Sequence, residues 1–153
     1  MPDACIVRPV VQADFFAWTP LWDAYNAFYG RQGETALSPQ ITRTTWQRFF
    51  DENEPVFALV AEREGRLLGL THFLFHRSTT RIELTCYQQD VFTDPSARGQ
   101  GVGRALIQGV YARARVEGIT RVYWQTHESN AAGRALYDKL AQHAGFLIYA
   151  HDV

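Results

Sequence analysis

A glycine-rich run lies between a predicted strand and a predicted helix in the second half of the chain. Its sequence is Arg98-Gly99-Gln100-Gly101-Val102-Gly103-Arg104. Glycine lets a backbone approach a bound group without Cβ atoms in the way, and the first N–H groups of a helix attract an anion. The run therefore predicts a phosphate-binding turn, to which Arg98 and Arg104 can add charge-assisted hydrogen bonds. The alternative is an ordinary strand-to-helix turn that uses glycine only for its sharp geometry.

Two common phosphate-binding loops do not fit this run. A nucleotide-kinase loop needs Gly-Lys followed by Ser or Thr, and no such triplet follows at the required spacing. A dinucleotide-binding loop needs glycine where Arg104 stands, and it opens a strand–helix–strand unit. The glycine run here follows a predicted hairpin instead, so both loop types are excluded.

Hydrophobic periodicity divides the chain into strands and helices. The expected strands are residues 4–10, 56–63, 67–75, 83–93, 121–126 and 146–149, and the expected helices are residues 14–29, 41–50, 101–117 and 131–143. Glu64-Gly65 predicts a tight hairpin turn, Gly118 a helix end and Asn130 a helix N-cap. The order predicts a single domain over residues 1–153, of the α+β or mixed α/β class, with helices on both faces of a sheet.

The charge balance argues against a nucleic-acid partner. Lys plus Arg is 15 and Asp plus Glu is 16, which gives a net charge of −1. Such a chain has no overall field that would attract a polyphosphate backbone. We therefore expect a small-molecule partner and no nucleic acid.

The cysteines, the histidines and the lengths of the apolar runs indicate where the protein is located and whether it binds a metal. Cys5 and Cys86 show neither a metal-site spacing nor a disulfide framework, so we expect reduced core residues and a cytoplasmic location. The five histidines show no metal-ligand spacing, and we expect no metal. No run of about 18 apolar residues predicts a membrane span, and residues 1–10 lack the layout of a signal peptide.

Two sequence blocks resemble a known family. Arg98-x-x-Gly101-x-Gly103, after a strand ended by Asp94-Pro95, is similar to the pyrophosphate motif of the GNAT superfamily of acyl-CoA-dependent N-acetyltransferases. The block from Asn130 to Tyr137 resembles the segment that closes that family's cofactor site. The likeness extends along nearly the whole chain, and residues 21–29 and 72–78 look like a bacterial subgroup often labelled histone- or polyamine-acetyltransferase-like.

The resemblance implies a fold, a co-substrate and a set of residues. The fold is a mixed, largely antiparallel sheet splayed between its fourth and fifth strands, and the co-substrate is acetyl-CoA. By similarity, main-chain groups of Val91, Phe92 and Thr93 contact the pantetheine arm and the thioester carbonyl. The other implied cofactor-binding residues are Arg98, Gly99, Gln100, Gly101, Val102, Gly103, Arg104, Asn130, Ala132 and Gly133. Tyr137 matches the tyrosine that protonates the departing CoA thiolate, and a phenol is a reasonable proton source there.

Aromatic residues of the first predicted helix are candidates for the acceptor pocket. Trp22, Tyr25 and Tyr29 cluster there, in a region that frames the acceptor in this superfamily. Aromatic walls suit an amine, although aromatic residues at helical spacing also pack as core. Asp90 is a further candidate acceptor ligand.

The residue that removes the amine proton is not fixed by the sequence. Polyamine-type members of the family carry a Glu-Asp pair on the fourth strand, where this chain has Gln89-Asp90. The expected glutamate base is therefore missing, which argues against polyamine specificity. Asp90, His127 and Glu128 remain as candidates.

Together these features predict transfer of an acetyl group from acetyl-CoA to a primary amine of a small molecule, such as a polyamine or an amino acid. Direct attack in a ternary complex is preferred, because no histidine-based activation surrounds either cysteine. The alternatives are a protein or peptide lysine acceptor and a non-catalytic acyl-CoA-binding module. Asn130 and Tyr137 favour the enzyme. By analogy with relatives that dimerise, residues 146–149 are expected to be an edge strand that pairs or exchanges in a homodimer.

Overall fold

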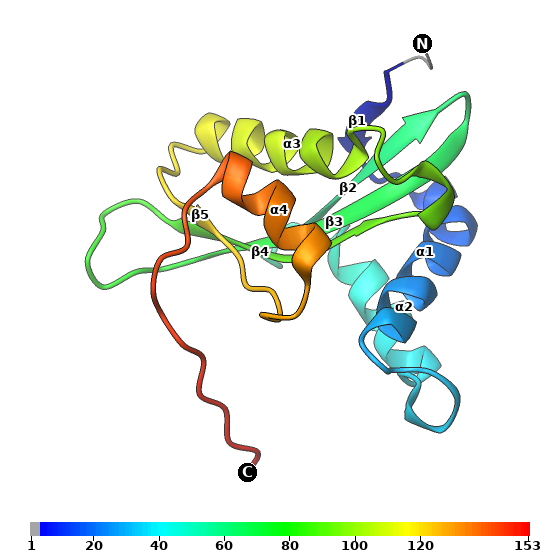
Figure 1. Cartoon of the computed structure of the whole chain (residues 1–153), viewed down its shortest axis with the longest axis horizontal. Coiled ribbons are helices and arrows are strands. Elements are labelled where there is room, and N and C mark those ends of the chain that lie inside the picture. The colour runs from blue at the N-terminus through cyan, green and yellow to red at the C-terminus, as the bar shows by residue number, and fades with distance from the viewer. Residues whose placement is uncertain (1–3) are drawn as a thin grey trace.

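Five strands form one sheet, and their spatial order β1-β2-β3-β4-β5 follows their order along the chain. The computed structural model describes residues 4–153. The strands are β1 Ile6–Pro9, β2 Val56–Arg63, β3 Arg66–His76, β4 Thr85–Thr93 and β5 Val122–Tyr123. The first three pairings are antiparallel and β4 and β5 are parallel. The sheet is therefore mixed and largely antiparallel, as predicted (Figure 1).

The β2–β3 hairpin lies at the centre of the sheet, where the sequence predicted it. Glu64 and Gly65 have φ values of 51° and 78°. Two successive positive φ values give a two-residue turn whose twist matches that of the flanking strands. All residues from Leu67 to Phe73 are buried, because helices cover both faces of β3.

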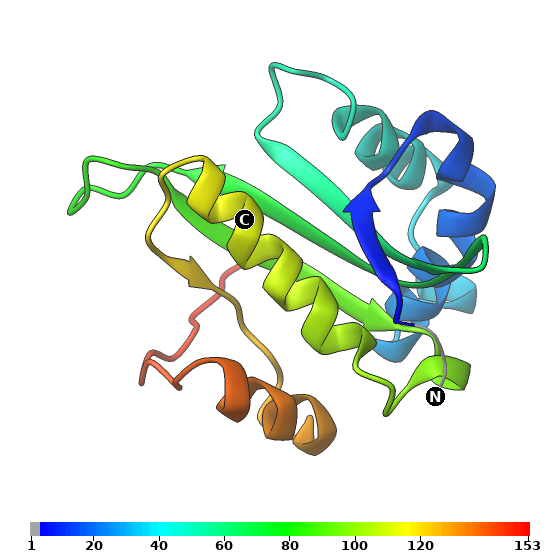
Figure 2. The same ribbon diagram turned by 90° about the horizontal axis from the view of Figure 1, so that it is seen from above.

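Helices cover the sheet on both sides, which confirms the predicted architecture. The helices are α1 Phe15–Phe28, α2 Pro39–Arg48, α3 Val102–Val116 and α4 Ala131–Leu140, with short 3-10 turns η1 Gln12–Asp14, η2 Gly33–Thr35 and η3 Pro95–Ala97. Helices α1 and α2 lie on one face and α3 on the other (Figures 1 and 2). Trp18 and Trp46 pack with Leu70 in the first core, whereas Val110 packs with Phe73 in the second.

Strand β4 carries one extra residue relative to β3. His72 lies opposite Asp90 and Phe73 lies opposite Gln88, so Gln89 forms a bulge. The bulge resets the alternation of side chains along β4. Asp90 therefore bonds His72 on the α1 face of the sheet, whereas Gln88 bonds Thr71 on the opposite face.

Strands β4 and β5 pair over a short distance and then diverge. Their pairing joins Cys86 to Val122 and Tyr87 to Tyr123. The predicted strand at residues 121–126 is therefore too long, because the chain leaves β4 after Tyr123. Val122 and Tyr123 are half-buried. Beyond Tyr87, no strand in the described part of the chain pairs with this edge of β4.

The end of the chain differs from the sequence prediction. Helix α4 ends at Leu140 rather than at residue 143, and the predicted strand at 146–149 is absent from the described residues. That segment extends away from the body of the protein, where it meets no neighbouring strand (Figure 1). Its four side chains are between 65% and 91% exposed. An isolated extended segment has no ladder partner and cannot count as a strand.

Candidate active site

The glycine loop adopts the geometry that its sequence predicts. Strand β4 ends at Thr93, and Asp94 Oδ1 accepts a 2.8 Å hydrogen bond from the N–H of Ser96 to start η3. Gly99 and Gly101 then have φ values of 75° and 83°, in the left-handed region that side chains rarely adopt. A Cβ atom at either position would meet no atom within 4 Å, so the loop faces open space.

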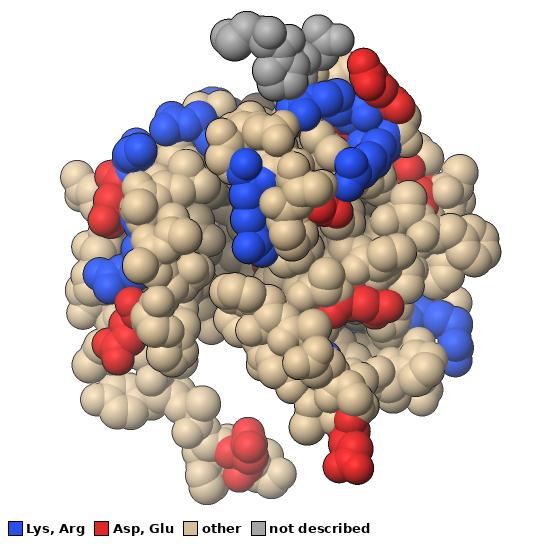
Figure 3. Space-filling view, turned by 45° about the vertical axis from the view of Figure 1, so that its right-hand side comes forward, with Lys and Arg blue, Asp and Glu red and all other residues tan. Residues whose placement is uncertain are grey.

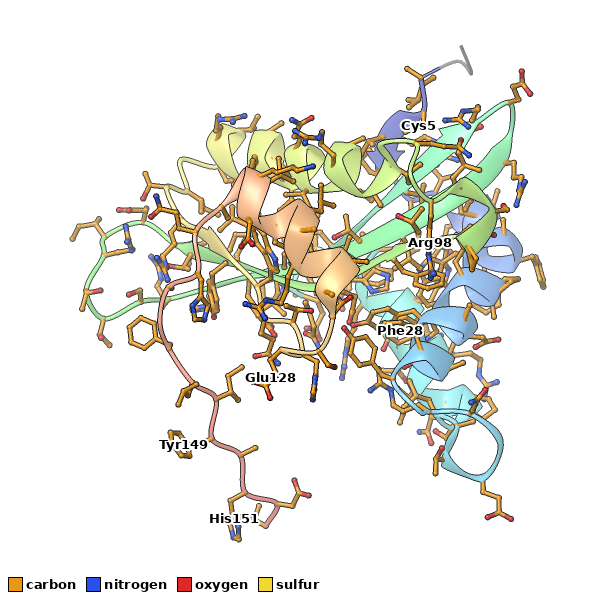
Figure 4. The ribbon with its side chains drawn as sticks, in the orientation of Figure 1. Cys5, Phe28, Arg98, Glu128, Tyr149 and His151 are labelled. Atoms are coloured by element: carbon orange, nitrogen blue, oxygen red, sulfur yellow. The ribbon has the colours of Figure 1, made fainter. Side chains whose placement is uncertain are left out.

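Helix α3 begins directly at this loop. Gly101 is its N-cap and supplies no side-chain cap, so the first N–H groups of the helix stay available to a ligand. The guanidinium of Arg98 lies 5.9 Å from the Phe92 ring, on the α1 side of the loop (Figure 4). The loop can therefore bind an anionic group through backbone N–H donors and nearby arginine.

Three predicted loop residues have identifiable structural roles. Gln100 accepts a 2.7 Å hydrogen bond from Arg63 at the end of β2, which anchors the loop to the sheet. The Val102 side chain is fully buried, so only its main chain can face a ligand. A Cβ atom on Gly103 would lie 3.2 Å from Leu136, so glycine there lets α3 approach α4 closely.

The end of β4 offers one free backbone edge. On one side Val91, Phe92 and Thr93 pair with β3. On the other side the pairing with β5 stops at Tyr87. The side chains of Val91 and Phe92 pack into the cores on opposite faces of the sheet. These residues can therefore serve a ligand only through their main chain, which is the role that the resemblance implies.

The block before and within α4 forms a tightly packed helix start. Asn130 Oδ1 accepts a hydrogen bond from the N–H of Gly133 at 3.2 Å, and its Nδ2 donates to Thr126 at 3.0 Å. This confirms the predicted N-cap. A Cβ atom on Gly133 would lie 2.4 Å from the Asn130 amide, so this cap requires glycine. Ala132 is exposed beside it.

Tyr137 lies on α4, on the same side of the sheet as α3. Its half-buried ring packs edge-on against Trp124, with centroids 5.5 Å apart. Burial raises the pKa of the Tyr137 phenol, and the nearby Tyr29 phenol raises it further. The hydroxyl therefore stays protonated around neutral pH and can donate a proton.

The predicted acceptor residues do gather on one side of β4. Trp22 stacks on Tyr25 with centroids 5.6 Å apart, and Tyr25 meets Tyr29 edge-on at 5.1 Å. Burial, followed by the charge of Asp90, raises the pKa of Tyr25. The four candidates form a continuous path from the buried carboxylate to the end of α1.

A cavity of about 570 Å³ opens beside this path, between α1, α2 and the β3–β4 pair. Its charged lining residues are Arg31, Arg48, Glu54 and Asp90. Arg48 is held at 3.9 Å by Glu54, whereas Arg31 donates a 2.7 Å hydrogen bond to the uncharged amide of Asn26. The cavity thus combines a carboxylate at one place with an unneutralised guanidinium at another.

Among the candidate proton acceptors, Asp90 has the most constrained setting. Its carboxylate is buried and accepts a 2.9 Å hydrogen bond from His72, and its main-chain oxygen accepts one from Thr71 at 2.8 Å. His127 and Glu128 are exposed in the loop before α4, where Glu128 is labelled in Figure 4. Gln89, at the position of the family glutamate, is the exposed bulge residue.

His72 and its partner Trp18 were not among the predicted site residues. The only sequence signal is an ionisable residue, His72, inside the largely apolar run from Leu67 to Phe75. Trp18 Nε1 donates a 3.0 Å hydrogen bond to His72 Nε2. The contact joins residues 54 positions apart, so it depends on tertiary packing.

Other chemistries find less support. Both cysteines are free, and burial raises the pKa of the Cys86 thiol to about 12, which disfavours a thiolate nucleophile. Within residues 4–153 no group of three or more His, Cys, Asp or Glu side chains could hold a metal ion.

None of the described helices is long and apolar enough to cross a membrane. Basic and acidic side chains are interspersed on the face drawn in Figure 3.

Comparisons with known proteins agree with this geometry. The acetyltransferase (GNAT) family model matches residues 18–141. The D-amino-acid N-acetyltransferase HPA3 of Saccharomyces cerevisiae is 32% identical over 152 residues, which cover 98% of this chain and 92% of that protein.

Two solved structures share the fold. A transcriptional regulator from Bacillus halodurans C-125 aligns with a TM-score of 0.83 and 17% identity, covering 97% of this chain and 99% of that one. AAC(6′)-Iy, in complex with the bisubstrate analogue CoA-S-monomethyl-acetylneamine, aligns with a TM-score of 0.82 and 13% identity, covering 99% of both chains.

Proposed function

Because this chain belongs to the GNAT acetyltransferase family and is an acetyl-CoA-dependent N-acetyltransferase, we propose that its acceptor is a small amino acid or a close analogue. One observation carries the proposal. Asp90, which lines the cavity, directly precedes the free backbone edge at residues 91–93. Neighbouring strand residues are about 3.3 Å apart, so an amine held at Asp90 lies within reach of an acyl group held at that edge.

The residues present fit acetyl-CoA as co-substrate. The left-handed glycines and the uncapped start of α3 suit the pyrophosphate, with Arg98 and Arg104 as nearby cations. The free edge at Val91, Phe92 and Thr93 suits the amide groups of the pantetheine arm. Acetyl-CoA supplies the acyl thioester when it is bound. Asn130, Ala132 and Gly133 shape the start of α4, on the far side of the opening where β4 and β5 diverge.

Each reacting group has a proposed partner in this site. Asp90 accepts a proton from the ammonium group, which frees the nitrogen lone pair to attack the thioester carbonyl carbon. A main-chain N–H at the β4 edge stabilises the negative charge that develops on the carbonyl oxygen. As the N–C bond forms, the C–S bond breaks, the Tyr137 hydroxyl donates its proton to the departing sulfur, and the attacking nitrogen releases its second proton to solvent. Solvent then reprotonates the tyrosine.

The charges of the cavity favour an amino acid over a polyamine. Asp90 suits the ammonium group, and Arg31 can bind a carboxylate in a bidentate manner. A polyamine has no carboxylate and would place a second cation near Arg31. The yeast relative is named as a D-amino-acid N-acetyltransferase, which supports the same class. A polyamine or a peptide lysine remains the alternative acceptor.

Replacement of Arg31 tests the assignment of an amino-acid acceptor. We expect acetyl-CoA-dependent thiol release with amino acids to exceed release with the corresponding amines that lack the carboxylate. Arg31→Gln should abolish this preference by raising KM for the amino acid at least tenfold, because a charged hydrogen bond contributes about 1.5–3 kcal/mol. Arg115→Gln, an exposed arginine on α3, is the control. Equal turnover of both acceptor types by the unmodified protein would refute an amino-acid acceptor.

We also propose that two copies assemble by exchanging their C-terminal segments. Phe146, Leu147, Ile148 and Tyr149 are apolar on both sides of an extended chain, and all four are exposed. The outer edge of β5 is unpaired among the described strands, and α4 beside it has no fully buried residue. A strand from a second copy would pair with β5 and cover the half-exposed side chains there.

A further inference from the structure

Three buried side chains form a hydrogen-bonded row behind the cavity. Trp18 on α1 is fully buried, His72 on β3 is 3% exposed and Asp90 on β4 is 8% exposed. Trp18 Nε1 lies 3.0 Å from His72 Nε2, and His72 Nδ1 lies 2.9 Å from Asp90 Oδ2. The row thus runs from the aromatic core to the carboxylate that lines the cavity.

The chemistry of the two end groups fixes the proton on the central ring. An indole N–H can only donate a hydrogen bond. His72 Nε2 must therefore accept, and it carries no proton. The remaining ring proton is on Nδ1, from which it is donated to the Asp90 carboxylate. A second proton on Nε2 would face the Trp18 N–H, so the imidazole stays neutral.

The surroundings of His72 reinforce this state. Its ring packs against Trp18 and Trp22 from α1 and Phe49 from α2, with centroids 5.7, 5.1 and 4.8 Å away. Asp90 faces it from β4, and the Tyr25 phenol of α1 lies near that carboxylate. The other charged groups of the cavity are Arg31 from the segment after α1, Arg48 from α2, and Glu54 between α2 and β2. His72 itself lines the cavity, but it is only 3% exposed, so water has little access to its ring nitrogens.

We propose that His72 is a positioning residue that orients the Asp90 carboxylate for the acceptor amine and stabilises it by hydrogen bonding, and that Trp18 locks His72 in the tautomer this requires. The inference rests on the proposed role of Asp90. The hydrogen bond from His72 engages Oδ2, so the ring does not occupy Oδ1. His72 is thereby a fixed donor and does not relay the proton.

Two amide variants separate the donor from the acceptor function of the ring. The amide nitrogen of His72→Asn can take the place of Nδ1 and still donate to Asp90. The amide oxygen of His72→Gln can take the place of Nε2 and accept from Trp18, without restoring the donor. His72→Leu removes both. Thermal unfolding and acetyl-CoA titration of each variant report on the fold and on the cofactor half of the site.

The pH profile of kcat/KM for the acceptor is the decisive measurement. His72→Leu and His72→Gln should lower kcat/KM by about 100-fold, the lower end of a general-base contribution, and move the acidic limb to higher pH. His72→Asn should restore both kcat/KM and the position of the acidic limb of the pH profile. Two results would overturn the positioning role. One is a wild-type pH profile in all three variants. The other is an equal loss of kcat/KM in His72→Asn and His72→Gln that follows a lowered Tm. An acetyl-CoA-saturated wild-type protein that acetylates no amine would instead refute the proposed function.

Nitrogen-15 NMR of the histidine rings tests the tautomer without catalysis. We expect a protonated Nδ1 and an unprotonated Nε2 for His72 in the folded protein. Trp18→Phe removes the indole donor and should no longer hold the His72 ring in a single tautomer. A protonated Nε2 in the wild-type protein would overturn the inference even if the variants lose activity.

Discussion

Tyr137 lies on α4 with its ring against Trp124, and its hydroxyl is the proposed proton donor to the departing thiolate. Burial raises the pKa of this phenol above that of a free tyrosine. The protonated form is the active form, so its contribution is fully present at neutral pH and is lost only as pH rises through the elevated value. The rate should therefore persist beyond the pH at which an exposed tyrosine ionises.

Replacement of this hydroxyl gives a direct test at the residue scale. Tyr137→Phe should lower kcat by roughly 100-fold, because a general acid contributes about 10²–10⁴ and a thiolate is a fair leaving group. Acetyl-CoA affinity should not change. Tyr111→Phe is a matched control, because this neighbour of Trp124 donates its hydroxyl only to the main chain of Leu140. Rates of Tyr137→Phe equal to wild type across the pH range would exclude the acid role.

Sequence reasoning identified some residues of the site and missed others. Asp90 and the aromatic residues of α1 were each identified from the local sequence around them, and the structure brings them together. Trp18 and His72 were missed because their hydrogen bond depends on how α1 packs on β3. The choice of Asp90 over His127 and Glu128 depends on burial, which patterning alone did not supply.

At the scale of elements, the hairpin, the strand-to-helix turn at the glycine loop and the helix start at Asn130 were predicted correctly. Each follows from local turn or capping chemistry. The bulge at Gln89 and the early end of β5 depend on the register between strands, which no local pattern encodes. The segment at 146–149 has the composition of a strand, but strand formation also needs a partner edge.

The proposed exchange of this segment predicts the mass in solution. The full chain should have twice the monomer mass of 17.5 kDa by light scattering. Ile148→Pro should give monomers, because proline removes a ladder donor in the middle of the exchanged strand. His151→Pro, placed after the apolar residues, should remain dimeric. A monomeric wild-type protein, or an Ile148→Pro dimer, would contradict the exchange.

At the scale of the whole molecule, the site joins two halves that meet at β4. In the proposed function, the glycine loop, the start of α3 and α4 form the cofactor half, and α1, α2 and the Asp90 cavity form the acceptor half. The bulge in β4 turns Asp90 toward the acceptor half, while the residues after it keep a free edge for the cofactor half. This division predicts that a variant can lose acetylation of the acceptor and still bind acetyl-CoA.

The most direct test measures acetyl-CoA affinity and amino-acid acetylation in two variants. Gly101→Val places a branched side chain at φ 83° and should abolish acetyl-CoA binding, and with it all acetylation. Asp90→Asn should bind acetyl-CoA like the wild type and lose turnover by at least about 100-fold. Unchanged acetyl-CoA affinity in Gly101→Val, or full turnover in Asp90→Asn, would contradict the account.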